Sequence, residues 1–209
     1  MKLFNPNHFE NLYEKISLTP NQIEEMIKGY SLVFPQVRNK DVEWGIQFPM
    51  FIPTFYSCVL SLQRIPKQNE FWELYRTEHK MILENYNDEI LWALQARVFR
   101  TYPSIVRDIH FGLFLKNAQS VYEIWYNLKL DIEDGVDLMA ISNDKYWALN
   151  LFINSTRAQF GRSVKANRHT KFDNVTYVDI PASYNKYKVG MFFLYGIDEY
   201  NSVLSKISS

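Results

Sequence analysis

Two short strand-like segments, separated by Asn143-Asp144-Lys145, constrain the fold of this chain most strongly. Residues 135–141 and 146–154 have the length and the residue content of β-strands. Asn and Asp are common in tight turns because their side chains bond to nearby backbone and tolerate left-handed conformations. We therefore predict a β-hairpin, which requires a sheet in this part of the chain.

The hairpin lies in a half of the chain that differs from the first hundred residues. Before it, apolar residues recur at helical spacing, and Thr19-Pro20 has the features of a helix start. Predicted helices cover residues 20–34, 53–63, 69–86, 87–99 and 101–116. Predicted further elements are strands at 121–130, 175–180 and 189–195 and a helix at 199–207. The expected class is α/β (α+β), with a helical region at 1–99 packed on a mixed sheet at 100–209 as one compact unit.

Composition excludes several classes of protein. The 209 residues include 23 Lys and Arg and 23 Asp and Glu, so bulk charge does not favour nucleic acid. Cys58 is the only cysteine, which excludes an intrachain disulfide and a cysteine-based zinc site. The most apolar window, 48–62, contains two prolines and is too short to cross a bilayer. No secretion signal opens the sequence, so we expect a cytoplasmic protein without a membrane partner.

Polar residues within the two hairpin strands are the candidate chemical groups. Alternation places Asp137 on one face with Met139 and Ile141, and places Asn150 on one face of the following strand. A carboxylate within an apolar strand is costly unless it is paired, hydrogen-bonded or bound to a metal. The two residues are therefore expected to share a face. Alternatively, Asp137 pairs with a base such as Arg107, and Asn150 is a buried amide satisfied by backbone.

The order of elements from residue 100 onward resembles the PD-(D/E)XK, or restriction-endonuclease-like, nuclease superfamily. That family has a helix bearing an acid, a strand, a hairpin, a further helix and a further strand. By this resemblance Asp108 is the helix acid and Asp137 is the metal ligand of the first hairpin strand. Asn150 and Phe152 occupy the positions of the family's Glu and Lys.

The resemblance implies a Mg²⁺-dependent DNA endonuclease in restriction, phage defence or a mobile element, acting as a homodimer. Asp137, Asp108 and Asn150 would be the metal ligands, and Arg157 would join them as a catalytic residue that stabilises phosphate charge. Phe152 cannot replace the family's Lys. Lys145, Arg157 or Lys165 is a possible substitute for that cation, and Asp134 is a possible second carboxylate.

A basic run follows the hairpin. Residues 157–171 contain no acid and hold five cations, namely Arg157, Arg162, Lys165, Arg168 and Lys171. Such a run neutralises phosphates, and Arg matches phosphate geometry with two parallel hydrogen bonds. We therefore predict that these residues bind nucleic acid, with DNA favoured over RNA. The alternative is a solvated surface helix.

Three classes of function remain after these observations. The first is the metal-dependent endonuclease. The second is the same fold with an inactive site, acting as a DNA-binding or scaffolding subunit, and the missing Glu-x-Lys favours it. The third is an interaction protein that uses its aromatic helices.

Phe71, Trp72 and Tyr75 are expected in the core, and Cys58 is expected to be a buried thiol. His110 either packs near Asp108 or acts as a general base.

Overall fold

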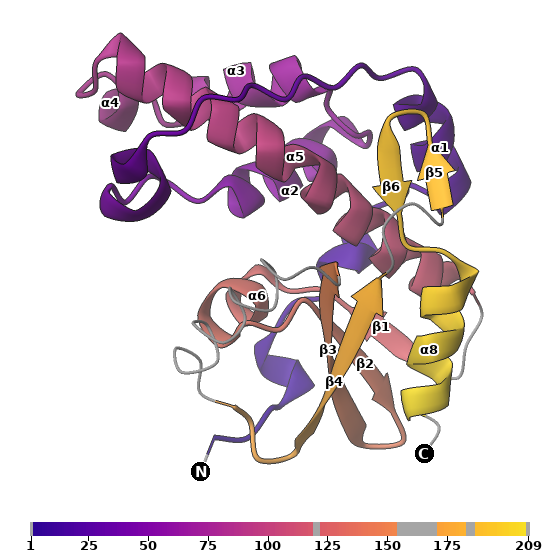
Figure 1. The fold of residues 1–209 in the computed structure, drawn as a ribbon. Coiled ribbons are helices and arrows are strands. Elements are labelled where there is room, and N and C mark those ends of the chain that lie inside the picture. Colours follow the sequence, from indigo (N-terminus) through magenta and orange to yellow (C-terminus); the bar gives the residue numbers. More distant parts are fainter. Residues whose placement is uncertain (1, 119–121, 154–170, 183–186, 208–209) are drawn as a thin grey trace. The chain divides into compact units, whose positions relative to one another are not determined.

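The computed structural model describes residues 2–118, 122–153, 171–182 and 187–207 (Figure 1). It contains helices and a mixed four-stranded sheet, which confirms the predicted α+β class. Contacts divide the chain into two compact units. The sheet unit comprises Met1–Pro20, Asp108–Lys188 and Phe193–Ser209, and the helical unit comprises Asn21–Arg107 and Val189–Phe192.

The helical unit is built from amphipathic helices around a core of aromatic rings. Its helices are α1 (Pro20–Lys28), α2 (Phe51–Leu62), α3 (Gln68–Glu78), α4 (Lys80–Leu83) and the first part of α5 (Asp88–Asn117), with a π-helical turn at η3 (Asp41–Gly45). Phe71 and Tyr75 are fully buried and Trp72 is nearly so, which confirms that these rings belong to the core. Cys58 is also buried, as predicted, and burial raises the pKa of its thiol to about 11.

Helix α5 runs through Pro103 without a break, so the prediction of two helices divided near residue 100 is wrong. Proline has no N–H to donate to the carbonyl four residues earlier, which normally ends or kinks a helix. Here that carbonyl belongs to Phe99, and it accepts a hydrogen bond of 3.0 Å from Nε2 of the buried Gln68. Gln68 also bonds to the N–H and the carbonyl of Val33. A side chain from α3 therefore satisfies the group that Pro103 leaves unpaired.

The substitution Gln68→Leu should lower the free energy of unfolding by about 2 kcal/mol, because it leaves the buried Phe99 carbonyl without a donor. In a Pro103→Ala background the cost should fall, because the restored N–H can donate to the same carbonyl. Urea unfolding of the two single variants and the double variant measures this coupling. Equal costs in both backgrounds would contradict the assigned role of Gln68.

The sheet unit contains four strands in the order β1-β2-β3-β4 (Figure 1). They are β1 (Glu123–Trp125), β2 (Leu138–Ser142), β3 (Lys145–Ile153) and β4 (Val175–Ala182). Strands β1, β2 and β3 pair antiparallel, and β3 pairs parallel with β4. Asn143 and Asp144 have φ values of 47° and 62°, which are typical of the tight hairpin turn between two strands. The predicted hairpin is confirmed.

Two predicted strands are different elements in the structure. In the segment predicted as a strand at 121–130, the described residues from 122 onward form the three-residue β1, after which α6 (Leu128–Asp134) begins. The Asn127 side chain accepts from the N–H groups of Lys129 and Leu130 and so starts this helix. The segment at 189–195 is not one strand but part of a hairpin, β5 (Tyr187–Val189) and β6 (Phe192–Leu194), which turns at Gly190 with φ of 55°.

The two faces of the sheet have different coverings. On one face, Met139 and Ala148 pack in a cluster with Leu130 of α6 and with Phe4 from the N-terminal segment. That segment also contains η1 (Pro6–His8) and η2 (Leu12–Lys15). On the other face, Tyr122 lies edge-on to Trp147 and donates to the carbonyl of Ile207 in α8 (Ile197–Ile207). Both faces of the sheet therefore pack against elements of its own unit.

The last turns of α5 belong to this same unit and pack against the N-terminal segment. A Cβ atom built on Gly112 would lie 1.9 Å from the hydroxyl oxygen of Tyr13, so this position accepts only glycine without rearrangement. Tyr13 is fully buried and stacks on Tyr126. This packing holds the first residues of the chain beside β1, where the N–H of Leu12 donates to the Tyr126 carbonyl.

Candidate functional site

The candidate site lies at the end of the sheet where β2 begins and where β3 and β4 end. Leu138 is paired with Leu149, so Asp137 lies one residue outside the ladder and beside Asn150. Asn150 is in turn paired with Asp179 on β4. The register also pairs Met139 with Ala148 and Ile141 with Tyr146, so the predicted shared face of the two hairpin strands is confirmed.

The half-buried carboxylate of Asp137 bonds to the backbone of β3. Its Oδ2 accepts a hydrogen bond of 2.6 Å from the N–H of Leu151. The β2–β3 ladder ends at the pair Leu138–Leu149, so β2 offers no paired residue opposite Leu151. The Asp137 side chain accepts from the Leu151 N–H in place of a β2 carbonyl. This bond gives Asp137 a structural role and fixes one carboxylate oxygen at this end of the sheet.

Asp179 is the residue at this site that the sequence reasoning missed. Its Oδ1 accepts a hydrogen bond of 3.2 Å from Nδ2 of Asn150. The available signal was a carboxylate within the strand Val175–Ala182, the same signal that identified Asp137. Tyr177 precedes Asp179 on the same face, burial raises the pKa of its hydroxyl, and that hydroxyl accepts a hydrogen bond from the N–H of Phe172.

The other predicted site residues are distributed differently. Asp108 is half-buried in α5, in the part of that helix that belongs to the sheet unit. Asp134 is buried and forms an ion pair with Lys2, so its carboxylate already has a cationic partner. Lys145 is exposed beside the hairpin turn, and the length of β2, roughly 16 Å, separates it from Asp137. Lys145 therefore cannot supply the cation at this end of the sheet.

Most of the predicted basic run lies outside the described residues. Arg157, Arg162, Lys165 and Arg168 fall within residues 154–170, and their predicted role stays a prediction. Lys171 is described and exposed, and its Nζ lies 4.9 Å from the centre of the Tyr177 ring. This cation therefore lies above the sheet face that carries Asn150 and Asp179. It lies over Tyr177, whose partner Ala148 belongs to the apolar cluster.

The donors at this end of the sheet suit a hard cation. Mg²⁺ takes oxygen ligands, and it is commonly held by one or two carboxylates together with waters and substrate phosphates. The carboxylates of Asp137 and Asp179 and the amide oxygen of Asn150 are such donors. In the part of the chain that the structure describes, no three His, Cys, Asp or Glu side chains are grouped to hold a metal ion. A cation here would therefore depend on the amide oxygen and on ligands from solvent or substrate.

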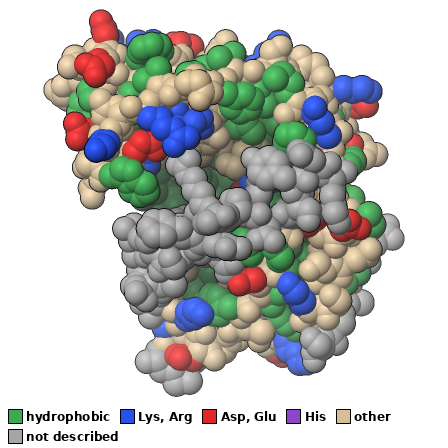
Figure 2. All heavy atoms as spheres, viewed as in Figure 1, with side chains coloured by type: hydrophobic (Ala, Val, Ile, Leu, Met, Phe, Trp, Pro, Cys, Tyr) green, Lys and Arg blue, Asp and Glu red, His purple; other side chains and the backbone are tan. Residues whose placement is uncertain are grey.

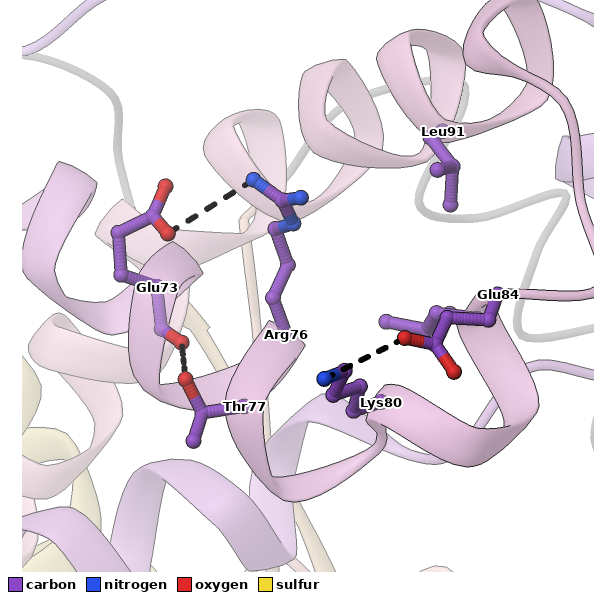
Figure 3. A pocket seen from close by; sticks show the side chains of 7 residues that line it. Glu73, Arg76, Thr77, Lys80, Glu84 and Leu91 are labelled. Carbon is purple, nitrogen blue, oxygen red and sulfur yellow. Dashed lines mark hydrogen bonds and ion pairs between the residues drawn. The ribbon is translucent and has the colours of Figure 1, made fainter.

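A hollow of about 400 Å³ lies on the helical unit and has different chemistry (Figure 3). Arg76 pairs with Glu73 at 3.7 Å, and Lys80 pairs with Glu84 at 3.5 Å. Because each cation has an acid beside it, the hollow carries no excess positive charge for a phosphate. Its lining does not favour the nucleic-acid role over any other.

The described part of the face drawn in Figure 2 carries mixed charge. On the face drawn in Figure 2, the described basic and acidic side chains are interspersed with apolar ones. None of the described helices is both long enough and apolar enough to cross a membrane.

Comparisons with models of known protein families, with curated proteins and with solved structures found no match.

Two substitutions separate the structural role of Asp137 from its charge. Asp137→Ala should lower the free energy of unfolding by about 1–2 kcal/mol, because the N–H of Leu151 loses its acceptor. Asp137→Asn should cost less, since its amide oxygen can accept the same bond. Thermal or urea unfolding of both variants measures the difference. Equal losses would show that the bond to Leu151 is not what Asp137 contributes.

Proposed function

We propose that this chain is a DNA-acting protein of the restriction-endonuclease-like fold, and that it hydrolyses DNA with Mg²⁺. One observation carries the proposal, namely the register that brings Asp137 and Asn150 together at one end of a mixed sheet. The order of α5, β1, the β2–β3 hairpin and β4 supports it, because these elements follow one another as in the resembling nuclease superfamily, with α6 inserted between β1 and β2.

In this proposal the chain holds the cation with Asp137, assisted by Asn150 and Asp108. The bound cation would supply an activated water and would stabilise charge on the leaving oxygen. Asp137 keeps its position because one of its oxygens is bonded to the Leu151 N–H. Arg157 or Lys165 of the basic run would neutralise charge on the phosphate. The setting would be cytoplasmic, in restriction, phage defence or a mobile element, with two copies of the chain acting as a homodimer on duplex DNA.

The first experiment measures cleavage of plasmid DNA with Mg²⁺ or Mn²⁺. Asp137→Asn should reduce cleavage at least about 100-fold, because it removes the ligand charge while it keeps the oxygen that accepts from Leu151. Glu123→Gln is the matched control, since Glu123 is an exposed strand acid at the turn end of the same sheet. The control should cleave like the unaltered protein. Equal activity in Asp137→Asn would overturn the proposed catalytic role of Asp137.

A second function, binding without cleavage, is favoured by one specific observation. Phe152 stands on β3 two residues after Asn150, at the position where the resembling family has its Lys. Salt-sensitive DNA binding without metal-dependent cleavage would support this second function, in which the chain is a DNA-binding or scaffolding subunit. The absence of both activities would leave a protein-interaction role as the remaining class.

DNA affinity should depend on the basic run in both functions. Replacing Arg162 and Lys165 with Gln should reduce the slope of log affinity against log salt by about 1.8, because each lost phosphate contact contributes about 0.9. Replacing the exposed Lys28 and Lys40 with Gln removes the same charge from the helical unit and should leave the slope nearly unchanged. Fluorescence anisotropy with a labelled duplex over a salt series measures the slope. Equal losses in the two variants would contradict a specific role for the run.

A further inference from the structure

The amide of Asn150 has a defined orientation because of its partner on β4. The two residues are paired across parallel strands, and Nδ2 of Asn150 donates to Oδ1 of Asp179 at 3.2 Å. We infer that Asp179 is a positioning residue, which keeps the Asn150 oxygen available to a cation or its bound water beside Asp137. This inference rests on the proposed function and adds to it a residue with a stated role.

The chemistry of the pair determines which end of the amide faces Asp179. An ionised carboxylate only accepts hydrogen bonds, whereas an amide has a donating NH₂ end and an accepting oxygen. The reverse orientation would place two oxygens against each other with no proton between them. Asp179 is exposed, so its carboxylate is accessible to water. The amide NH₂ therefore faces Asp179 and the oxygen is directed elsewhere.

The orientation matters because only the oxygen can hold a cation. An amide NH₂ group offers no lone pair, while the amide oxygen is a weak ligand of the kind that Mg²⁺ and Mn²⁺ accept. Among the described residues, none donates a hydrogen bond to Oδ1 of Asn150. Asp137 lies beside Asn150, and its carboxylate accepts a hydrogen bond from the N–H of Leu151, the residue that follows Asn150 in β3. Asp179 thus acts on the candidate site through Asn150.

Packing does not require a polar pair at this position. One pair earlier on the same face, Ala148 lies opposite Tyr177, and both pack with the apolar cluster under α6. A hydrogen bond between partly exposed side chains contributes little to stability. Lys206 of α8 donates to the backbone oxygen of Asp179 and holds this part of β4 independently of the carboxylate. A change to the carboxylate should therefore alter the orientation of Asn150 more than the fold.

Metal binding by the full chain tests the inference without using cleavage. The signal of free Mn²⁺ in electron paramagnetic resonance reports the affinity of each variant. Asp179→Asn should weaken Mn²⁺ binding about tenfold, the effect expected when a residue that orients a ligand is lost. The exchange Asn150→Asp with Asp179→Asn reverses donor and acceptor and should restore at least the original affinity. Glu123→Gln, a strand acid at the other end of the sheet, should leave the affinity unchanged.

A second measurement reports the hydrogen bond itself. The side-chain NH₂ signals of Asn150 in ¹⁵N nuclear magnetic resonance, assigned by their loss in Asn150→Asp, should shift in Asp179→Asn, because the acceptor of their hydrogen bond changes. They should stay unshifted in Glu123→Gln. Unshifted signals in Asp179→Asn would overturn the inference.

The two proposals fail in different ways. Unchanged Mn²⁺ affinity in Asp179→Asn, together with loss of binding in Asp137→Asn, would overturn the role of Asp179 and leave the proposed metal site intact. Absence of Mn²⁺ binding by the unaltered protein would overturn the metal-dependent function and the inference together. A tenfold loss that the exchanged pair reverses supports both.

Discussion

The pairing of β2 with β3 is the constraint on which the candidate site depends. The Asn143-Asp144 turn has only two residues, and both adopt left-handed conformations, so the register of the two strands follows from the turn. A slip of one residue would move Met139 from the apolar cluster to the opposite face. The same register places Asp137 beside Asn150. A single register of β2 and β3 therefore produces both the packing of Met139 in the apolar cluster and the arrangement of Asp137 beside Asn150.

Strand β4 extends this arrangement from an antiparallel hairpin to a mixed sheet. Its parallel pairing with β3 places Asp179 next to Asn150, at the same end as Asp137. The face of the sheet thus changes from apolar at Ala148 and Tyr177 to polar at the next pair. In the proposed function, the cation would bind at this polar end of the sheet, where oxygen donors lie next to the apolar cluster.

The candidate site was predictable where local periodicity decides the outcome. Alternation placed Asp137 on one face of its strand with Met139 and Ile141, and the expectation that Asn150 shares this face was confirmed by the β2–β3 register. The bond from Leu151 to Asp137 was not predictable, since it depends on where the β2 ladder begins. Asp179 was missed because its importance comes from a neighbour 29 residues away in the sequence.

For the fold, the sequence by itself determined the α+β class, the hairpin and the helix that begins at Pro20, because their signals are local turn, cap and periodicity patterns. Only the tertiary structure decided the continuity of α5. Proline removes a backbone donor, and the replacement comes from Gln68, 31 residues before the carbonyl that it satisfies. Tertiary structure likewise decided the partner of Asp134, because Lys2 lies 132 residues earlier in the sequence. Such long-range pairs have no local signature, since they exist only once the elements are packed.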